Sequence, residues 1–400
     1  MMLQAVIAGG GIGGLAGALS LSLAGWDVRL LERAAEFSEV GAGIQMGPNV
    51  VRVLQSWGLG DALKGVAAFP GWLRVRSAQT GGQLAAMRLG DTIAQRYGAP
   101  YATIHRADLH ALLLDAVQAG GAHLHLDRPI TSFSQNAQAV TIDAAGCPGI
   151  EADALIGADG VRSVVRSQLL GDGPAQFTGH LAYRALVRQA DLPEQLRTQD
   201  VTAWLGRRMH VVQYPVRSGE WLNVVALVEG PLPQGAELWD HDATAAGLQG
   251  ALKGSCAALQ DLIQAPTGWR LWPLNGREPM RGPGEHAVGR VALIGDAAHP
   301  MLPYLAQGAG MAIEDAAELG RVLAQGIGPL KQAIDVPTLL QRFALNRWQR
   351  NARVQARARR NGVVFHAEGP LRWARDASMK LLCEKLLDMP WLYGESTPES

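Results

Sequence analysis

The feature that most constrains this chain is a glycine-rich turn, GGGIGG, that directly follows a short apolar segment near the first residue. Gly9, Gly11 and Gly14 fit the pattern G-x-G-x-x-G. The apolar residues 5–8 are typical of a strand buried on both faces of a parallel sheet, and residues 15–23 carry Leu and Ala at helical spacing. In this pattern the first glycine permits a tight turn, the second lets a pyrophosphate approach the backbone, and the third lets the helix pack on the strand. The pattern therefore predicts a phosphate site at a helix N-terminus.

An acidic residue at the expected distance makes this pattern more specific. Residues 27–31 predict a second strand, and Glu32 follows it, 21 positions after Gly11. About 20 positions separate such a turn from the acid that binds a ribose hydroxyl. A carboxylate there repels a 2′-phosphate, which argues against NADP at this turn. The rival interpretation is a signal peptide, but residues 1–4 lack the Lys or Arg that such a segment carries.

Composition excludes several classes of function. The 400 residues exceed what one hydrophobic core usually holds, so we expect at least two packed units. Basic and acidic residues are balanced at 36 each, which favours neither nucleic acid nor an anionic membrane. We interpret the Arg-rich residues 342–360 as a helix with a basic solvent face. No uninterrupted apolar run approaches the ~20 residues of a membrane helix.

The cysteines indicate the compartment. Cys147, Cys256 and Cys383 are odd in number and widely separated, so they predict no metal site and no redox pair. This pattern fits a reducing, cytoplasmic environment. It also excludes flavoenzymes that relay electrons through a nearby disulfide.

The chain predicts an α/β fold whose nucleotide-binding unit is discontinuous in sequence. We expect short strands within residues 72–96, a helix over 106–120, a strand over 122–126, a hairpin from 139–143 and 151–156, a buried strand over 290–295 and a helix over 309–325. The predicted divisions are a nucleotide-binding unit (residues 1–72, 101–175 and 276–325), a substrate unit with an inserted antiparallel sheet (73–100 and 176–275) and a helical C-terminal region (326–400).

Two further motifs place carboxylates at strand ends. The segment ALIGADGVRS puts Asp159 and Gly160 after an apolar strand, and RVALIGDAAHP does the same for Asp296. The carboxyl ends of parallel strands form the crevice in which α/β sheets bind ligands. Gly308 and Gly310 then precede a helix, whose N-terminus stabilises negative charge on a nearby ring.

With these motifs in order, the chain resembles the single-component flavin-dependent aromatic hydroxylases. The resemblance covers essentially the whole chain, including GAGIQ at residues 41–45, TIHRADL around Arg106 and WLYG at 391–394. Within the family, the chain is most similar to 3-hydroxybenzoate 6-hydroxylases and salicylate hydroxylases. The resemblance implies a Rossmann-like FAD-binding domain with an inserted antiparallel substrate sheet, a tightly bound FAD, and NADH or NADPH as a transient electron donor. It also implies hydroxylation of a phenolic or N-heteroaromatic acid by oxygen through a flavin C4a-hydroperoxide.

The resemblance also implies roles for individual residues. Glu32 would bind the adenine-side ribose, Arg106 the pyrophosphate region and Asp296 the ribityl chain. Asp159 belongs to a motif that serves both FAD and the nicotinamide donor, although Asp159 and His299 are equally well explained as residues that tie a turn together. The complete set of expected cofactor-binding residues is Gly9, Gly11, Ile12, Gly13, Gly14, Glu32, Arg33, Arg106, Asp159, Asp296, Gln307, Gly308, Ala309 and Gly310.

The expected substrate side lies on the strand RMHVVQYP. Its residues His210 and Tyr214 share one face, roughly 13 Å apart along the strand. A phenolate is a better nucleophile than a phenol, and His is suited to removing the phenol proton. We expect His210 and Tyr214 to be catalytic, with Gln45, Pro303 and Tyr214 contacting substrate. In the 3-hydroxybenzoate 6-hydroxylase pattern a Gln assists the His where this chain has Pro303, which leaves the identity of the phenol open.

Other functions remain as alternatives. Trp204, Trp221 and Trp239 would suit a larger apolar pocket for a quinone precursor or an antibiotic, although core packing explains them equally well. A non-catalytic FAD-fold carrier is the third possibility, and Asp296 argues against it. Arg184 and Arg208 are both candidates for a substrate carboxylate. A homodimer is expected only from the general behaviour of soluble proteins.

Overall fold

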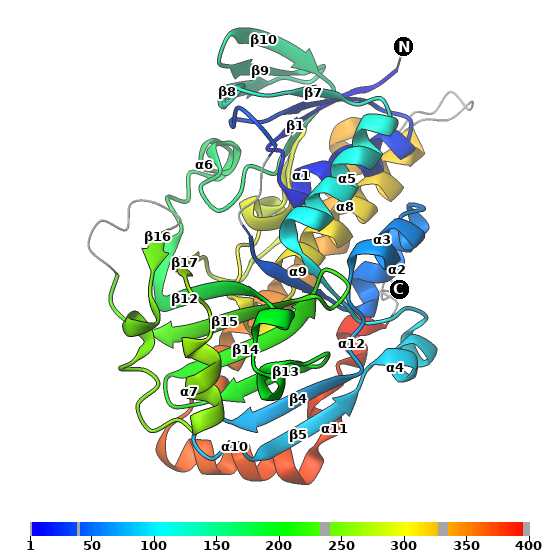
Figure 1. Cartoon of the computed structure of the whole chain (residues 1–400). Coiled ribbons are helices and arrows are strands. Elements are labelled where there is room, and N and C mark those ends of the chain that lie inside the picture. The colour runs from blue at the N-terminus through cyan, green and yellow to red at the C-terminus, as the bar shows by residue number, and fades with distance from the viewer. Residues whose placement is uncertain (1, 38–40, 233–240, 327–334, 395–400) are drawn as a thin grey trace.

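The computed structural model describes residues 2–37, 41–232, 241–326 and 335–394. A six-stranded sheet with the order β18-β19-β11-β1-β2-β7 forms its nucleotide-binding half (Figure 1). These strands are β1 (Gln4–Ala8), β2 (Asp27–Leu31), β7 (His123–His125), β11 (Ala154–Gly157), β18 (Ala287–Val288) and β19 (Val291–Leu293). All neighbouring pairs are parallel except β18 with β19. The closing strands thus lie far along the chain from β1, as the sequence predicts.

Helices cover the six-stranded sheet and share one core with it. They include α1 (Ile12–Leu23), α5 (Arg106–Ala119) and α8 (Gly308–Leu323), with α2 (Pro48–Ser56) and α3 (Gly60–Val66) beside them, while α6 (Val164–Leu170) follows β11. Ile7 of β1, Leu15 of α1 and Ile313 of α8 are fully buried in this core. The predicted helices 106–120 and 309–325 are confirmed within two residues at each end.

An eight-stranded sheet with the order β16-β17-β12-β15-β14-β13-β4-β5 forms the other half. Its strands are β4 (Trp72–Ser77), β5 (Gln83–Arg88), β12 (Gln176–Arg188), β13 (Val201–Leu205), β14 (Met209–Val216), β15 (Trp221–Glu229), β16 (His241–Ala243) and β17 (Trp269–Gly276), with α7 (Ala257–Gln264) packed nearby. The early strands β4 and β5 therefore join the later ones. The prediction of strands to residue 96 is wrong at its end, because α4 (Gly90–Tyr97) occupies that stretch and buries Ile93.

The predicted hairpin is only partly right, because its strands belong to a three-stranded sheet that ends before residue 154. Its strands are β8 (Ile130–Gln135), β9 (Val140–Ala144) and β10 (Cys147–Ala152). β9 pairs with β10, whereas residues 154–157 leave the hairpin and join the six-stranded sheet as β11. The change of sheet occurs at Asp153. Its carboxylate accepts a hydrogen bond from the backbone N–H of Gln4, in β1, at 2.8 Å. Strands β3 (Gly43–Met46) and β6 (Ala102–His105) form a separate antiparallel pair.

Helices make up most of the described residues 335–394. These are α9 (Val336–Phe365), α10 (Gly369–Leu382), α11 (Glu384–Leu387) and α12 (Pro390–Tyr393). α9 packs along α8, while α10 and α11 contact β5 of the large sheet. The interpretation of the Arg-rich face of α9 is only partly right, because Arg347 is buried within an internal ion-pair network. Among the described residues, no helix combines the length and the apolar character needed to cross a membrane.

Candidate functional site

The first cavity lies at the carboxyl ends of β1, β2 and β11. It has a volume of about 540 Å³, and its lining includes the following predicted cofactor residues: Gly9, Gly11, Glu32, Arg33, Arg106, Asp159 and Asp296. The Glu32 carboxylate accepts hydrogen bonds from the backbone N–H groups of Gly10 at 2.5 Å and Ala34 at 2.8 Å. These bonds fix the carboxylate at the wall of the cavity, beside the glycine turn. This is the place that a ribose-binding acid requires.

The glycine turn tolerates no side chain at two of its positions. A Cβ on Gly14 would lie 1.9 Å from the carbonyl oxygen of Gly9. Gly9 itself has φ +102°, and a Cβ there would lie 2.6 Å from the carbonyl oxygen of Ala158. Gly11 is the N-cap of α1 and offers no side-chain cap. The first turn of the helix therefore presents its backbone N–H groups to the cleft, as a pyrophosphate needs.

The Asp159 carboxylate is hydrogen-bonded to residues of the turn that follows it. Its carboxylate accepts hydrogen bonds from the Ser163 hydroxyl at 2.5 Å and from the Val164 backbone N–H at 2.7 Å. Burial raises the pKa of Asp159, while the Ser163 hydroxyl and the backbone N–H groups oppose that rise. This geometry supports the turn-tying interpretation, although Asp159 also lines the first cavity.

A second cavity of about 300 Å³ continues the first. Both are lined by Gly11, Arg106, Gly160 and Asp296, so together they form one elongated cleft between the two large sheets. Asp296 is accessible from this cleft, and the enclosing protein raises the pKa of its carboxyl while Arg106 opposes the rise. An extended dinucleotide that begins at Glu32 would pass both Arg106 and Asp296, since both residues line both cavities.

The N-terminal end of α8 contributes small residues to the wall of the second cavity. Ile12 and Gly13 on one wall face Gly308 and Ala309 on the other. The Gln307 side chain is turned toward α2, where its amide oxygen accepts a hydrogen bond from Asn49 Nδ2 at 3.1 Å. A Cβ on Gly310 would lie 2.8 Å from Val50, so Gly310 serves the packing of α8 on α2. The expected contacts of Gln307 and Gly310 with the flavin remain predictions.

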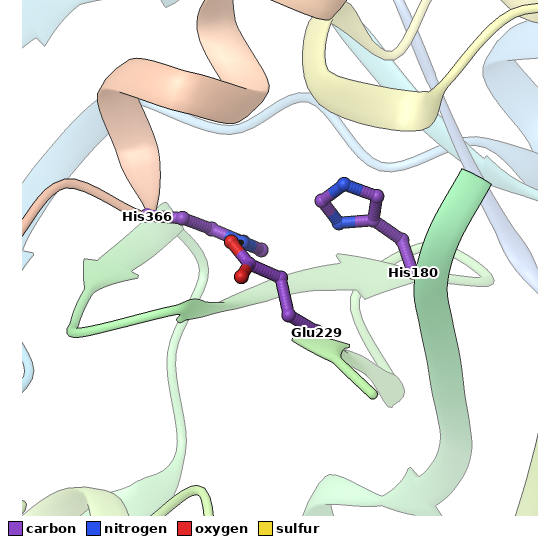
Figure 2. Close-up of side chains that lie close together, drawn as sticks. All are labelled: His180, Glu229 and His366. Atoms are coloured by element: carbon purple, nitrogen blue, oxygen red, sulfur yellow. Dashed lines mark hydrogen bonds and ion pairs between the residues drawn. The ribbon is translucent and has the colours of Figure 1, made fainter. Parts of the chain in front are cut away.

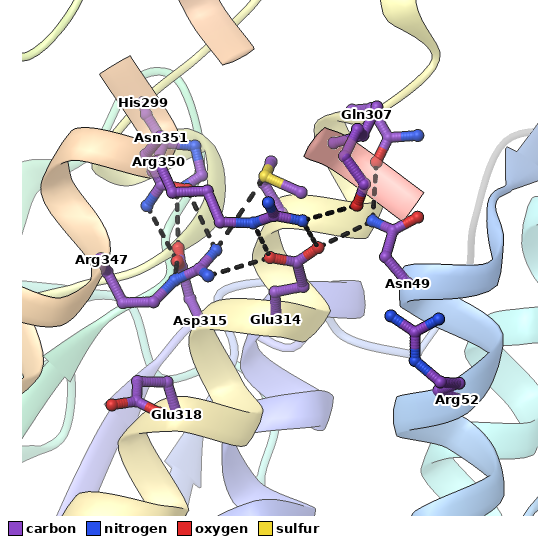
Figure 3. Close-up of polar contacts among 12 residues, drawn as sticks. Asn49, Arg52, His299, Gln307, Glu314, Asp315, Glu318, Arg347, Arg350 and Asn351 are labelled. Atoms are coloured by element: carbon purple, nitrogen blue, oxygen red, sulfur yellow. Dashed lines mark hydrogen bonds and ion pairs between the residues drawn. The ribbon is translucent and has the colours of Figure 1, made fainter. Parts of the chain in front are cut away.

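A buried charge network holds α8 in place behind this wall (Figure 3). Asp315 accepts hydrogen bonds from His299 at 2.5 Å and Arg347 at 2.8 Å, and Arg347 also donates to Glu314 at 2.9 Å. The pKa of Asp315 falls well below its ordinary value, because His299 and Arg347 together outweigh the upward effect of burial. Arg350 binds Glu314 as well. His299 therefore ties the loop after Asp296 to α8, which supports the structural alternative for His299.

The second cavity ends at the predicted substrate residues. His210 and Tyr214 of β14, Gln45 of β3 and Pro303 all line it, and their expected contacts with substrate remain predictions. The short 3-10 turn Pro303–Leu305 brings Pro303 to the wall. Gly43 makes room for Tyr214, since a Cβ there would lie 2.8 Å from the Tyr214 hydroxyl. Burial raises the pKa of Tyr214 far above its ordinary value, so its hydroxyl stays protonated.

His210 is neutral in this environment. Its side chain is fully buried, and burial lowers its pKa well below 6.5, with further lowering from His366 and His180. The hydroxyl-bearing ring of Tyr304 lies 5.0 Å from the imidazole, centroid to centroid. Sequence reasoning did not find Tyr304 or His366, because neither belongs to a motif and His366 lies 156 positions after His210.

Only one of the two candidate arginines faces the cavity. Arg184 lines it and stacks on the Trp272 ring, with 4.0 Å between its guanidinium carbon and the ring centroid. Arg208 is instead a surface residue that donates to Glu229 at 2.9 Å, so of the two candidates only Arg184 lines the cavity.

Trp204 and Trp221 fit the core-packing alternative. The cavity tryptophan is Trp272, which sequence reasoning missed. Trp204 is buried in the core of the large sheet. Trp221 begins β15 and lies opposite Val216 of β14, and Trp239 lies outside the described residues. Cys147, Cys256 and Cys383 are free.

Comparison with known proteins identifies the family. A family described as "FAD binding domain" matches residues 2–358. This chain belongs to that family. The 3-hydroxybenzoate 6-hydroxylase of Polaromonas naphthalenivorans is 38% identical, over 98% of this chain and 96% of the relative.

Solved structures agree with the sequence relatives. A salicylate hydroxylase–substrate complex matches with a TM-score of 0.82 and 30% identity, over 98% of this chain and 95% of the other. Klebsiella pneumoniae HpxO, complexed with FAD and uric acid, matches with a TM-score of 0.84 and 25% identity, over 96% and 94%. The predicted cofactor FAD and the predicted class, a FAD-dependent aromatic monooxygenase, are confirmed.

Proposed function

We propose that this FAD-dependent monooxygenase uses NADH or NADPH to hydroxylate a small phenolic acid of the 3-hydroxybenzoate or salicylate type. One observation carries the proposal: a single cleft joins the glycine turn and Glu32 to His210, Tyr214 and Arg184. When bound, FAD supplies the reduced ring that activates oxygen. The residues of this chain bind the acid, orient its ring and remove its phenolic proton.

His210 is the proposed base. Because it is buried and neutral, one ring nitrogen is available to accept the phenol proton without first losing its own. Ionisation of the phenol raises the electron density of the ring, which promotes attack on an electrophilic oxygen. Tyr214, on the same face of β14, keeps its hydroxyl proton and would orient the substrate hydroxyl by donating a hydrogen bond.

Arg184 is the proposed partner of the substrate carboxylate. Stacking on Trp272 holds the guanidinium plane at the cavity wall, and a guanidinium in a fixed orientation suits bidentate contact with a carboxylate. Val225 and Leu227 complete an apolar wall on the same side. The charged end of an aromatic acid would therefore point toward β12 and β17, and its ring would lie against β14 and β15.

The size of the cavity favours a small substrate over a quinone precursor or an antibiotic. About 300 Å³ is at the lower limit of ligand pockets. Gly13 and Ala309 line the same space at the flavin end, so the cofactor ring would occupy part of it. What remains suits one aromatic ring with small substituents, either a hydroxybenzoate or a hydroxylated N-heteroaromatic acid. The proposed reaction partners of the chain are a small substrate, oxygen and a nicotinamide donor. The proposed compartment is the cytoplasm.

The test is donor oxidation by the purified holoprotein across a panel of phenolic and hydroxypyridine acids. NADH and NADPH consumption, hydroxylated product and hydrogen peroxide are measured in the same samples. We expect one acid to accelerate donor oxidation and to yield about one product per donor. Faster oxidation that yields only peroxide with every acid would contradict the proposed substrate class, and a response only to larger ring systems would favour the alternative.

A further inference from the structure

A line of hydrogen-bonded side chains starts at His210 Nδ1 and passes through His366 to Glu229. His210 Nδ1 lies 2.9 Å from His366 Nε2, and His366 Nδ1 lies 3.1 Å from Glu229 Oε1. The three residues come from β14, from the C-terminal end of α9 and from the end of β15. Figure 2 shows the Glu229 carboxylate beside the His366 ring, with His180 of β12 on the other side.

The chemistry of the three groups fixes the direction of these hydrogen bonds. An ionised carboxylate only accepts, so His366 Nδ1 must carry a proton and donate it to Glu229. His366 Nε2 then has a lone pair and accepts from His210 Nδ1–H. His210 Nε2 is left as the nitrogen with a lone pair. The line therefore holds His210 in the tautomer that can receive a proton.

The two ends of the line differ in their access to water. His210 and His366 are 1% and 3% exposed, whereas the Glu229 side chain is 28% exposed. Glu229 and His180 also line a separate cavity of about 510 Å³ on the side away from His210. The line thus begins at the substrate cavity and ends at a space that solvent can enter.

We infer that His366 and Glu229 form a proton exit that carries the substrate's phenolic proton from His210 to solvent. The inference rests on the proposed function and assigns His366 and Glu229 as positioning and relay residues. The phenol O–H bond breaks as a proton binds His210 Nε2. The proton on His210 Nδ1 passes to His366 Nε2, and the proton on His366 Nδ1 passes to Glu229. Glu229 releases one proton to water, so one proton enters and one leaves. Both rings are then in the opposite tautomer, and the same transfers in reverse, which protonate the product phenolate from water, restore them; nothing is oxidised or reduced.

Four titratable or charged groups face this line. They are His180 of β12, Tyr304 of the 303–305 turn, Arg208 before β14, and Arg375 of α10, which faces His366. Burial lowers the pKa of His366 to about 4, and the hydrogen bond that His366 donates to Glu229 opposes this shift. Burial also acts to raise the pKa of Glu229, but hydrogen bonds from Arg208 and His366 outweigh it and keep the carboxyl ionised.

A neighbouring pair offers a competing exit and supplies a matched control. The Tyr304 hydroxyl lies 2.6 Å from His180 Nδ1, and the His180 and His366 rings lie 5.4 Å apart. His180 borders the same outer cavity but takes no part in the line from His210 to Glu229. His180→Ala therefore makes the same substitution in the same cluster without cutting the proposed exit.

The experiment compares wild type, His366→Ala, Glu229→Gln and His180→Ala with the acid that the wild type hydroxylates, from pH 6 to 9. General acid–base groups contribute about 100-fold or more to rate. Because His210 itself stays in place, we expect loss of the exit to have a smaller effect and to lower kcat at pH 7 by ~10-fold. In His366→Ala and Glu229→Gln, kcat should rise with pH, because more of the phenol then ionises without help. Wild type and His180→Ala should stay nearly flat. Added imidazole should restore His366→Ala several-fold and leave Glu229→Gln unchanged.

The outcomes separate the two proposals. Product formation by the wild type with flat pH profiles in both exit variants would overturn the proton exit alone. A rising profile in His180→Ala but not in His366→Ala would assign the exit to Tyr304 and His180 instead. No hydroxylated product from the wild type with any aromatic acid would overturn the proposed function and the exit with it. Glu229→Gln keeps a hydrogen-bonding amide at a partly exposed position, so it tests the exit even if His366→Ala fails to fold.

Discussion

At the scale of single residues, the contact between Arg184 and the substrate carboxylate gives a direct prediction. Hydrogen bonds to charged groups contribute about 1.5–3 kcal/mol, so Arg184→Gln should raise KM for the acid by roughly 10- to 100-fold and change kcat less. Steady-state kinetics with the acid and with its primary amide measure this effect. The amide should be nearly insensitive to the substitution because it carries no charge.

Arg188→Gln is the control for this prediction. Arg188 lies on the same strand, β12, and faces a tryptophan ring, Trp221, with 5.9 Å from its guanidinium carbon to the ring centroid, but it is exposed and away from the cavity. It should leave KM unchanged. Equal effects of both substitutions, or an unchanged KM in Arg184→Gln, would show that Arg184 does not bind the carboxylate.

Residues whose placement depends only on the local backbone could be predicted from the sequence. Gly9 and Gly14 are recognisable because the turn itself forbids a side chain, and His210 and Tyr214 because strand alternation puts them on one face. Prediction failed where contacts join distant segments. Arg184 lies on β12 and Arg208 directly precedes β14, and sequence pattern does not distinguish them, because only the contact of Arg208 with Glu229 turns it away from the cavity.

At the scale of elements, α8 and α9 are joined by buried charges, and cutting this junction should destabilise the fold. Removing one partner of a buried ion pair costs about 3–5 kcal/mol, because it leaves an uncompensated charge. Arg347 bonds both Asp315 and Glu314, but each acid keeps other partners, so Arg347→Met should lower the free energy of unfolding by about 3 kcal/mol. Urea unfolding followed by circular dichroism measures it.

Arg342→Met on the same helix is the matched substitution. Arg342 is exposed and bonds only Gln325 among the described contacts. Surface changes of this kind usually stay within about 0.5 kcal/mol. If the two substitutions gave equal losses, the buried network would not be what holds α9 against α8.

Elements with strong periodicity were predictable, and those whose identity depends on tertiary pairing were not. β2 matches its prediction at both ends, because its apolar residues pack on both faces of the sheet. Residues 151–156 were predicted as one strand, yet they divide between two sheets at Asp153. Residues 90–97 form a helix although their pattern resembled a strand, because one buried residue, Ile93, anchors a short amphipathic turn.

At the scale of the whole molecule, one cleft runs between the two large sheets, so FAD should stabilise the chain as a unit. A ligand that binds only the folded state adds about 2.7 kcal/mol at a free concentration 100 times its Kd. Removing FAD should therefore lower the unfolding temperature, and adding it back should restore the temperature as concentration rises. FMN should restore much less, because it lacks the ADP half that Glu32 and the glycine turn are placed to hold. Thermal unfolding followed by circular dichroism, with FAD or FMN titrated into the apoprotein, measures both effects.

Gly14→Val, whose side chain would collide with the Gly9 carbonyl, should abolish the difference between the two flavins if it folds. Equal stabilisation by FMN and FAD in the wild type would mean that the first cavity does not hold the ADP half, and the direction of the cofactor along the cleft would have to be reversed.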